Sequence, residues 1–588
     1  IQNIIILFMS SQREPYPKFS LGYSKIKSFD VSFLVANATT EPICETVSEP
    51  YNPFHITQLQ HYNPIYNELF EITENNYNKI ALNQQYQFVN MNVVEENASK
   101  NPVSKPVFIK YSPLVDPVHY VVGKYKTDKP FALPTPFNIG SDAPCMNKIC
   151  TPHNAAYIDN FFYYLSSQLL HHNFFVHGID FYGSFMGIQK HFMLDIVDDL
   201  EYLHSSTYFR NIRGDKIFLR DTHLINMFEN ESRKNRVKLH ISRTNQHNFT
   251  VENLDQDITD INDISASDLE PVYQQDCSSD NIMVLANNAN DESDDSTVNS
   301  EVSNSTDESG IDTVHFSDDD DDDTCSTSTC TSVGSLYAFI KDFPILATCI
   351  EKCDGTIDKL FDKQEIDCEQ GIAAMMQVIM ILITYQKAFR FTHNDLHTNN
   401  IMYTNTNKSY LYYRYKKQLY KVPTFGRIYK LIDFGRSIYT FNGRIFCSDS
   451  FAPGGDASTQ YNTEPFFDHD NKRIDPNYSF DLCRLGCSLF DFIMEDASFF
   501  NADHLDELQR TVCRWCSDDN GKNILYKRSG DERYPGFKLY KMIARTVHRH
   551  SPDEQLKHST FSRFEMSNKI ASKKNIKILD IDLIPVYA

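Results

Sequence analysis

Three polar side chains in the second half of the chain have the types and the spacing that phosphoryl transfer needs. Asp395 and Asn400 stand five residues apart in the stretch FTHNDLHTNNIM, which follows a long apolar segment. Asp433 comes after a short apolar run and begins the tripeptide DFG. Phosphoryl transfer requires a carboxylate that accepts the proton of the attacking hydroxyl and oxygen ligands for Mg²⁺. The pattern therefore assigns the base to Asp395 and the metal ligands to Asn400 and Asp433.

These two stretches resemble the motifs of protein kinases. HNDLHTNN (393–400) stands for the catalytic-loop pattern H-R-D-L-x-x-x-N, and DFG (433–435) follows it in the expected order. The resemblance implies an α+β, two-lobed protein-kinase-like fold, with a small β-rich lobe and a larger helical lobe. It also implies that ATP and Mg²⁺ are the cofactors.

The same resemblance extends to residues outside the two motifs. The run VFIK ends at Lys110, which would bind the phosphates of ATP, and Asp159 would position Lys110, although these enzymes normally use Glu there. His397 takes the place of a phosphate-contacting lysine. Backbone groups around Glu351 and Cys353 would meet the adenine. Beyond these candidates, the segment SFDLCRLG (479–486) resembles the helix whose aspartate, here Asp481, holds the backbone of the catalytic loop.

Longer stretches are similar to the kinases of nucleocytoplasmic large DNA viruses of the mimivirus-like group. They are VFIKYSPLVDP (107–117), NAAYIDNFFYYLSSQLL with HGIDFYGSF (154–185), THNDLHTNNIMY (392–403) and RYPGFKLYKMIAR (533–545). This resemblance implies a viral serine/threonine-protein kinase that acts on protein substrates inside the host cell. The expected location is the host cytoplasm, and packaging in the virion stays open.

Two departures from the kinase pattern affect what can be expected. No G-x-G-x-x-G precedes Lys110, and FVNMNV (88–93) stands in its place, so a flexible glycine loop around the phosphates is not expected. Asn394 replaces the arginine that usually receives the phosphate of the activation segment. We therefore expect activity that does not depend on phosphorylation of that segment.

Two alternative functions stay open. The first is a pseudokinase scaffold, which the missing glycines favour and the complete set Lys110, Asp395, Asn400 and Asp433 opposes. The second is a small-molecule kinase of the choline or aminoglycoside type, because those enzymes use a similar H-x-D-x-x-x-x-N loop. The intact DFG and the Asp481 segment speak against this second alternative.

The charge of the protein is concentrated in one segment. The net charge is −22, yet residues 252–323 hold 23 of the 78 acidic side chains and no Lys or Arg. The remainder has 55 acidic against 56 basic side chains, so neither part predicts binding to nucleic acid. A segment of this composition cannot bury enough apolar surface to fold alone, and we expect an insertion at about 245–334 that is disordered. Such an insertion suits a basic partner.

The remaining patterns define three expected regions. Residues 1–100 form an extension of unclear structure, in which residues 1–8 read as an artefact upstream of Met9. Residues 101–350 form the small lobe with the insertion, and residues 351–588 the large lobe. Within them we expect strands at 107–110, 174–185 and 343–350, around Asn400 and around Lys430, helices at 155–170, 370–387 and 481–494, a hairpin at about 410–421 and a mostly helical tail after residue 502.

No part of the sequence predicts a membrane span or a zinc site. The longest apolar run, residues 372–385, has about 14 residues, which fits a buried core helix better than the ~18 that a span needs. Cys513 and Cys516 form a single C-x-x-C without a second pair of ligands nearby. The 14 cysteines fit a reduced intracellular protein better than a disulfide framework.

Overall fold

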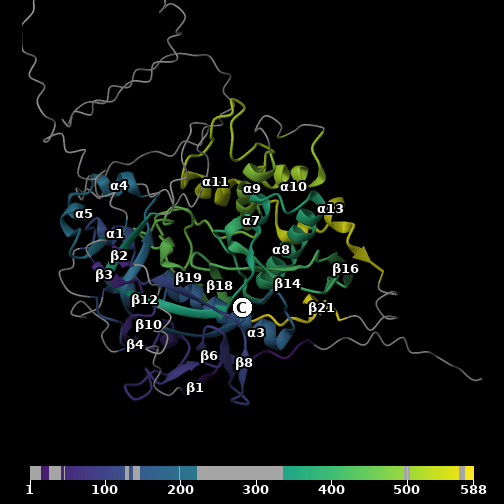
Figure 1. Cartoon of the computed structure of the whole chain (residues 1–588). Helices are drawn as coiled ribbons and strands as arrows, with labels where there is room; N and C mark the ends of the chain where they lie inside the picture. Colours follow the sequence, from purple (N-terminus) through teal and green to yellow (C-terminus); the bar gives the residue numbers. More distant parts are fainter. Residues whose placement is uncertain are drawn as a thin grey trace, which may run out of the picture. The chain divides into compact units, whose positions relative to one another are not determined.

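The computed structural model describes residues 15–25, 42–44, 47–125, 131–136, 146–197, 199–220, 336–494, 500, 504–567 and 577–588. All of them belong to one unit made of Ile1–Phe228 and His315–Ala588. In this described part the chain is a mixed α+β protein with several antiparallel sheets, as expected (Figure 1). Residues 1–8 and the insertion expected at about 245–334 lie outside the described residues.

The largest sheet has five strands, two of which are long. β10 (Phe181–Asp195) and β12 (Tyr337–Glu351) pair antiparallel along most of their length. β4 (Ile56–Gln60) pairs with β10, whereas β9 (Val107–Pro113) and β11 (Ile217–Leu219) pair with different parts of β12. Aromatic and β-branched residues are frequent in the two long strands, which suits them to a pleated and largely buried surface.

A three-stranded meander precedes β9. Its strands are β6 (Tyr86–Asn90), β7 (Val93–Glu96) and β8 (Pro102–Ser104). Only Met91 and Asn92 connect β6 to β7, and the Met91 carbonyl accepts a hydrogen bond from the Val107 amide at 2.9 Å. The tip of this hairpin therefore lies level with the first residue of β9. Lys110 is three residues further on, or about 10 Å along an extended strand.

Helix α3 (Ala155–Asn173) packs against β10 and β12 and confirms the helix expected at 155–170. Asn154 caps its first turn by accepting a hydrogen bond from the Ala156 amide at 3.0 Å. Phe174 ends the helix in the left-handed conformation, with φ at 58°. The chain then turns through Gly178, whose missing side chain allows close approach to the Ser166 carbonyl of α3. The strands expected at 174–185 are therefore wrong before Phe181, where β10 begins.

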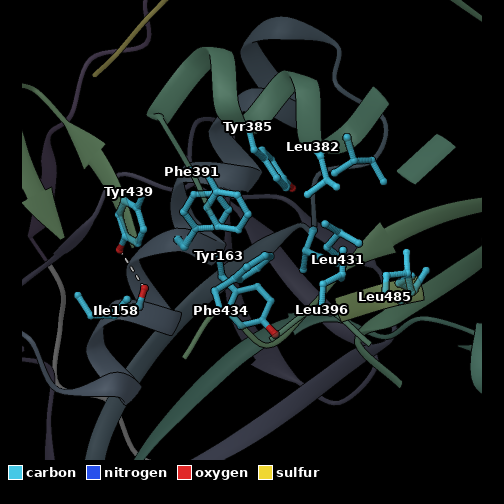
Figure 2. Close-up of a cluster of buried hydrophobic side chains, with 14 of the residues drawn as sticks. Ile158, Tyr163, Leu382, Tyr385, Phe391, Leu396, Leu431, Phe434, Tyr439 and Leu485 are labelled. Atoms are coloured by element: carbon cyan, nitrogen blue, oxygen red, sulfur yellow. Dashed lines mark hydrogen bonds between the residues drawn. The ribbon is translucent and has the colours of Figure 1, made fainter. Parts of the chain in front are cut away.

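Helix α8 (Cys368–Phe389) is a core helix, as expected from its apolar run. It is the one helix among the described residues that is long and apolar enough to cross a membrane, but 89% of its most hydrophobic window is buried. Leu382 and Tyr385 of α8 join the buried side chains around Phe391 and Phe434 (Figure 2). The ring of Phe162 from α3 lies 4.3 Å from that of Phe391 and 4.6 Å from that of Phe434.

The smaller elements complete the described chain. One further sheet consists of β13 (Gly355–Thr356), β14 (Ile401–Asn405) and β17 (Arg427–Leu431). Another consists of β15 (Tyr410–Tyr415), β16 (Gln418–Pro423), β20 (Glu565–Met566) and β21 (Leu579–Asp580). The other strands form two-stranded pairs: β18 (Ile438–Phe441) with β19 (Arg444–Cys447), β1 (Tyr23–Lys25) with β5 (Ile80–Leu82), and β2 (Pro42–Cys44) with β3 (Val47–Pro50). The other α-helices are α1 (Pro117–Val121), α2 (Asn147–Cys150), α4 (Leu200–Ser205), α5 (Thr207–Ile212), α7 (Ile357–Asp362), α9 (Phe480–Ile493), α10 (Glu507–Trp515), α11 (Lys538–Thr546), α12 (Pro552–Gln555) and α13 (Ser559–Ser562). The 3₁₀ turns are η2 (Pro64–Glu68), η5 (Thr398–Asn400), η6 (Asp449–Phe451) and η8 (Ile581–Leu583).

Most of the expected elements are present, with two corrections in this half of the chain. The hairpin at 410–421, the strand around Lys430 and the helix at 481–494 correspond to β15–β16, β17 and α9. Asn400 itself ends the 3₁₀ turn η5, and the strand starts one residue later. The tail after residue 502 contains four short helices, which are separated by loops and followed by two short strands, so it is not mostly helical in the described residues.

Candidate active site

Three charged side chains from separate elements meet at Lys110. Its Nζ lies 2.9 Å from Oδ2 of Asp159 on α3 and 2.8 Å from Oδ1 of Asp433, which follows β17. Asp159 is 2% exposed, whereas the side chain of Asp433 is 52% exposed. Burial alone would lower the pKa of Lys110, but the two carboxylates outweigh it and hold this pKa well above its usual value. Lys110 is therefore a fixed positive charge beside an accessible carboxylate.

The backbone around Asp433 is held by the same helix. Oδ1 of Asp159 accepts a hydrogen bond from the Phe434 amide at 2.6 Å, and the Tyr163 hydroxyl accepts one from the Asp433 amide at 2.9 Å. Asp433 adopts a left-handed conformation, with φ at 61°. This conformation is uncommon for residues other than glycine and persists only where the surroundings enforce it. The contacts from α3 supply that enforcement, and the packing of Phe434 against Phe162 adds to it.

Asp481 of α9 anchors the loop that carries Asp395. Its two carboxylate oxygens accept hydrogen bonds from the amides of His393 and Asn394, each at 2.9 Å. Asp481 is fully buried, and these two donors satisfy it. The contact expected from the sequence between Asp481 and this loop is thus present. His393 in turn contacts the Ile432 carbonyl through Nε2 at 2.9 Å, which ties the loop to the residue before Asp433.

The side chains of Asn400 and His397 contact each other, and that of Asn400 also contacts the backbone of Asp395. Nδ2 of Asn400 donates to the Asp395 carbonyl at 2.9 Å and lies 3.0 Å from Nε2 of His397. The Asn400 carbonyl accepts a hydrogen bond from the Ile432 amide at 3.0 Å, so Asn400 is next to Asp433. Because the amide nitrogen makes both side-chain contacts, Oδ1 of Asn400 is the atom that can face a cation.

The donor set fits Mg²⁺ bound jointly with phosphate. Among the residues that the structure describes, no three His, Cys, Asp or Glu side chains are grouped so as to hold a metal ion by themselves. Mg²⁺ sites of kinases and related enzymes use only one or two carboxylates, with substrate phosphates and water as the other ligands. The Asp433 carboxylate and the Asn400 amide oxygen match that pattern.

Asp395 lies in a more closed environment than Asp433. Oδ1 of Asp395 accepts a hydrogen bond from the Tyr540 hydroxyl at 2.8 Å, and Oδ2 lies 3.8 Å from Nη1 of Arg436. Burial raises the pKa of Asp395, and the positive charge of Arg484 offsets part of that rise. One oxygen of the Asp395 carboxylate is thus held by a tyrosine. Tyr540 and Arg484 lie in the stretches 533–545 and 479–486 that the sequence analysis singled out, but no role was predicted for either residue.

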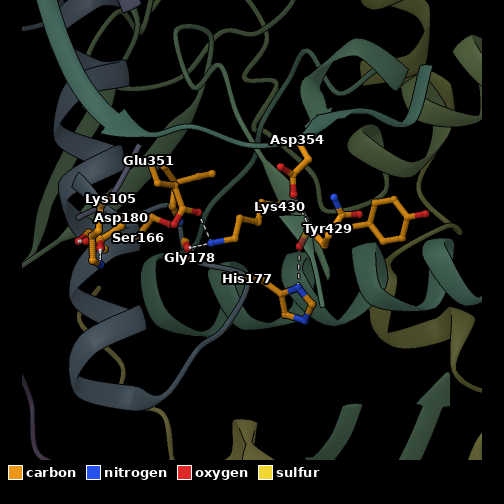
Figure 3. A network of polar contacts seen from close by, with 12 residues as sticks. Lys105, Ser166, His177, Gly178, Asp180, Glu351, Asp354, Tyr429 and Lys430 are labelled. Carbon is orange, nitrogen blue, oxygen red and sulfur yellow. Dashed lines mark hydrogen bonds and ion pairs between the residues drawn. The ribbon is translucent and has the colours of Figure 1, made fainter. Parts of the chain in front are cut away.

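Glu351, the last residue of β12, and Cys353, two residues later, differ in what they can offer a ligand. The side-chain carboxylate of Glu351 forms an ion pair with Lys430 (Figure 3), and the backbone amide of Glu351 donates to the backbone carbonyl of Asp180 at 2.9 Å. In the described part of the chain, neither the amide nor the carbonyl of Cys353 has a hydrogen-bond partner. Burial raises the pKa of the Cys353 thiol to about 12, so it stays protonated. Of the two residues, Cys353 has the free backbone groups.

Phe108 is a candidate binding residue that sequence reasoning missed. Successive side chains of a strand point to opposite faces, so Phe108 shares a face of β9 with Lys110. Its neighbours Val107 and Ile109 are buried, whereas Phe108 is 51% exposed. The register places it opposite Ile350, one residue before Glu351. Because side chains alternate between the two faces of a strand, the middle residue of VFI could have been expected to face away from its neighbours. All three residues are apolar, however, so the sequence alone does not show which face is exposed.

Comparisons with protein-family models and with curated protein sequences found no match for this chain. The geometry of the site therefore carries the functional argument.

Proposed function

We propose that this chain is a serine/threonine protein kinase that transfers the γ-phosphoryl group of Mg-ATP to protein substrates. The observation that carries the proposal is the cluster in which Lys110 contacts Asp159 at 2.9 Å and Asp433 at 2.8 Å. These residues come from a strand, a helix and a loop, and Asp433 is 323 positions from Lys110. The kinase resemblance predicts this juxtaposition of a phosphate-binding lysine, a helix acid and a metal-binding aspartate.

The order of the elements supports a kinase-like small lobe. The meander β6–β7–β8 leads into β9 with Lys110. The short helices α1 and α2 and then α3 with Asp159 follow, and α3 precedes the long strands β10 and β12, which α4, α5 and β11 separate in sequence. β12 pairs with both β9 and β10, so α3 crosses between two strands of one sheet. After β12 the chain continues to α8, which precedes the Asp395 loop, and then to α9, which anchors that loop.

Each side chain of the site then has a distinct task. The Asp395 carboxylate accepts the proton of the substrate hydroxyl, whose oxygen forms the new bond to the γ-phosphorus while the bond to the β–γ bridging oxygen breaks and ADP leaves. Lys110 neutralises phosphate charge, Asp159 fixes Lys110, and Asn400 and Asp433 would hold Mg²⁺. The ion supplies charge neutralisation at the β- and γ-phosphate oxygens when bound.

The nucleotide base and His397 have assigned places in this proposal. The base would lie beside the free backbone groups of Cys353, with the exposed ring of Phe108 as a stacking face. The side chain of Glu351 is engaged by Lys430, so Glu351 would contribute through its backbone alone. His397, oriented by Asn400, would donate a hydrogen bond to the phosphates.

Independence from activating phosphorylation is part of the proposal. Asn394 is fully buried, and its Oδ1 accepts a hydrogen bond from the Tyr461 hydroxyl at 2.8 Å. Its Nδ2 donates to the Arg436 carbonyl at 3.0 Å. Neutral hydrogen bonds thus join the Asp395 loop to the segment after DFG. An arginine at the position of Asn394 would need a phosphate group on that segment to make the same connection. Treatment with a phosphatase should leave turnover unchanged, and its loss would contradict this part.

The substrate, origin and location remain as the resemblance implies. Preference for Ser or Thr in proteins, a viral origin and action in the host cytoplasm belong to the same proposal, as does a basic partner for the acidic insertion. Nucleic acid and membranes are not expected partners. Basic and aromatic residues do alternate in β15–β16, but Lys416 is paired with Asp553 at 2.7 Å and Lys421 lies over the Tyr410 ring at 3.7 Å.

A pseudokinase scaffold is the second candidate function, and one observation favours it. The β6–β7 hairpin ends level with Val107 and does not reach over Lys110, so no described element of the meander covers the place of the phosphates. Weak nucleotide binding would follow. A small-molecule kinase is the third candidate. The Lys110 cluster would bind ATP phosphates in the same way in such an enzyme, so only tests of the substrate separate it from a protein kinase.

The test is transfer of labelled γ-phosphate from Mg-ATP to a generic protein substrate by wild type, Asp395→Ala and a matched surface control, Asp470→Ala. We expect label with wild type and the control, and loss of at least about 10²-fold with Asp395→Ala, because the general base is removed. Equal labelling by Asp395→Ala would overturn the assigned mechanism. If a folded wild type labels none of several protein substrates, the result would favour the pseudokinase scaffold. Label on metabolites alone would favour the small-molecule kinase.

A further inference from the structure

The Tyr540 hydroxyl on α11 connects a buried arginine to Asp395. Nε of Arg484, on α9, lies 2.9 Å from the Tyr540 hydroxyl, which lies 2.8 Å from Oδ1 of Asp395. A guanidinium nitrogen can only donate, so the hydroxyl oxygen accepts from Arg484. The single hydroxyl proton is therefore directed at Asp395. This chain of two hydrogen bonds has a fixed direction.

The surroundings of Tyr540 restrict its movement. Tyr540 is 7% exposed and Arg484 6% exposed. The Arg484 guanidinium lies 5.2 Å from the centre of the Tyr540 ring, and that of Arg436 lies 5.7 Å from it. The ring of Phe537 stacks on Tyr540 at 5.2 Å with an angle of 10° between the planes. A ring held on several sides can hold a carboxylate in one orientation.

We propose that Tyr540 is a positioning residue for phosphoryl transfer, which fixes the Asp395 carboxylate so that Oδ2 faces the substrate hydroxyl. The inference rests on the proposed function and deepens it. With Oδ1 committed to Tyr540 at 2.8 Å, rotation of the carboxylate would break that hydrogen bond. Among the described residues, the one charged partner of Oδ2 is the more distant Arg436, at 3.8 Å, so Oδ2 is the oxygen that takes the proton in this proposal.

The variant Tyr540→Phe removes the hydroxyl and keeps the ring. We expect kcat to fall about 10-fold, because a displaced general base loses part of its contribution, with KM for ATP unchanged. Tyr526→Phe is the matched control. Its hydroxyl also donates to a carboxylate, that of Asp491 at 3.2 Å, but this pair is not in contact with Asp395. The control should keep the kcat of the wild type.

A second pair of variants separates positioning from a loss of stability. Tyr540→Phe in the Asp395→Asn background, measured in single turnover with enzyme in excess, should cause no further decrease, because the hydroxyl acts through the carboxylate. If Tyr540→Phe unfolds below the assay temperature, Arg484→Lys takes its place. It keeps the hydroxyl and the charge but removes the Nε donor that directs the hydroxyl proton, so the same specific fall in kcat is expected.

The outcomes distinguish this inference from the proposed function. An active wild type with a Tyr540→Phe variant of equal or higher kcat would overturn the inference alone; a higher kcat would mean that the hydroxyl obstructs the base. An equal fold-loss in the Asp395→Asn background would also overturn it, as would a loss seen in KM for ATP. A folded wild type without any phosphate transfer would overturn the proposed function, and the inference with it.

Discussion

Two lysines five positions apart form ion pairs of opposite character. Lys105 lies between β8 and β9, and its Nζ contacts Oδ2 of Asp180 at 2.7 Å. The Asp180 carboxylate, 1% exposed, also receives His171 at 2.7 Å and the Ser167 hydroxyl at 3.2 Å. Lys110 contacts two carboxylates instead, and one of them, Asp433, is half exposed.

The difference lies in which partner is in excess. Around Asp180, several hydrogen-bond donors contact a single carboxylate, so groups inside the protein balance the negative charge of Asp180. Around Lys110 the carboxylates outnumber the cation, and Asp433 keeps an accessible face. Because a buried carboxylate with several partners is costly to disturb, the Lys105 cluster should determine stability. The Lys110 cluster, with an open side, should determine activity.

Replacement of Lys110 should produce the largest effect. Lys110→Met removes the charge that would meet the phosphates in the proposed function, and we expect phosphate transfer to fall by about 10³-fold. Lys105→Met, the same substitution five residues earlier, should leave kcat within about twofold of wild type. Steady-state kinetics on both variants measure this contrast. Similar activity losses in the two would remove the functional distinction between the clusters.

Replacement of Asp159 tests the buried half of the Lys110 cluster. Asp159→Asn keeps the size and the oxygen that accepts the Phe434 amide at 2.6 Å, but it removes the charge that fixes Lys110. We expect kcat/KM for ATP to fall by about 10²-fold, since Lys110 would then follow Asp433 alone. Asp180→Asn is the control with unchanged kinetics. Wild-type kinetics of Asp159→Asn would mean that Asp433 positions Lys110 without help.

The Lys105 cluster should show its effect in unfolding. Lys105→Met leaves the Asp180 carboxylate buried with His171 and Ser167 only, and we expect the free energy of unfolding to fall by about 2 kcal/mol. The amino group also lies 4.0 Å from the centre of the Tyr86 ring, a contact that the variant loses. Urea unfolding of the two lysine variants gives the comparison. A larger loss for Lys110→Met would reverse the assigned roles.

The smallest effect is a pH dependence of the same cluster. Burial raises the pKa of Asp180, but His171 and Lys105 outweigh it and bring this pKa below its usual value. Asp180 therefore contributes stability above the usual aspartate pKa of about 4, and the contribution is lost as the pH falls toward the lowered value. The unfolding free energies of wild type and Asp180→Asn should differ by about 1 kcal/mol at pH 7 and converge below pH 4. A constant difference would contradict the assigned cause.

Most residues of the candidate site could be predicted from local sequence motifs, because they lie in short stretches with fixed spacing. Asp395 and Asn400 lie five residues apart, and Asp433 comes two residues after the end of β17. Lys110, at the end of a strand pattern, and Asp159, within an amphipathic helix pattern, were assigned their roles by the resemblance to protein kinases alone. The structure brings Lys110, Asp159 and Asp433 into contact and places Asn400 beside Asp433. The assigned chemistry of these residues stays a prediction.

The residues that were missed depend on distant contacts. Tyr540 is 145 positions from Asp395, so no spacing rule connects them. Phe108 was read as one of three apolar strand residues, although only its two neighbours are buried. The strands expected at 174–185 are wrong for residues 174–180, because Phe174 takes the left-handed conformation that ends α3. Tertiary packing decided the first two of these cases, and a local left-handed helix cap decided the third.

The short β6–β7 hairpin has a consequence for the timing of a catalytic cycle. Enzymes that close a loop over their nucleotide often spend most of a cycle waiting for that loop to reopen and release the product. Here the hairpin tip is bonded to the Val107 amide, about 10 Å short of Lys110. A nucleotide at Lys110 would depart without waiting for this hairpin. The kinase that we propose should therefore bind ADP briefly, show no burst of product, and be limited in speed by the bond-breaking step itself.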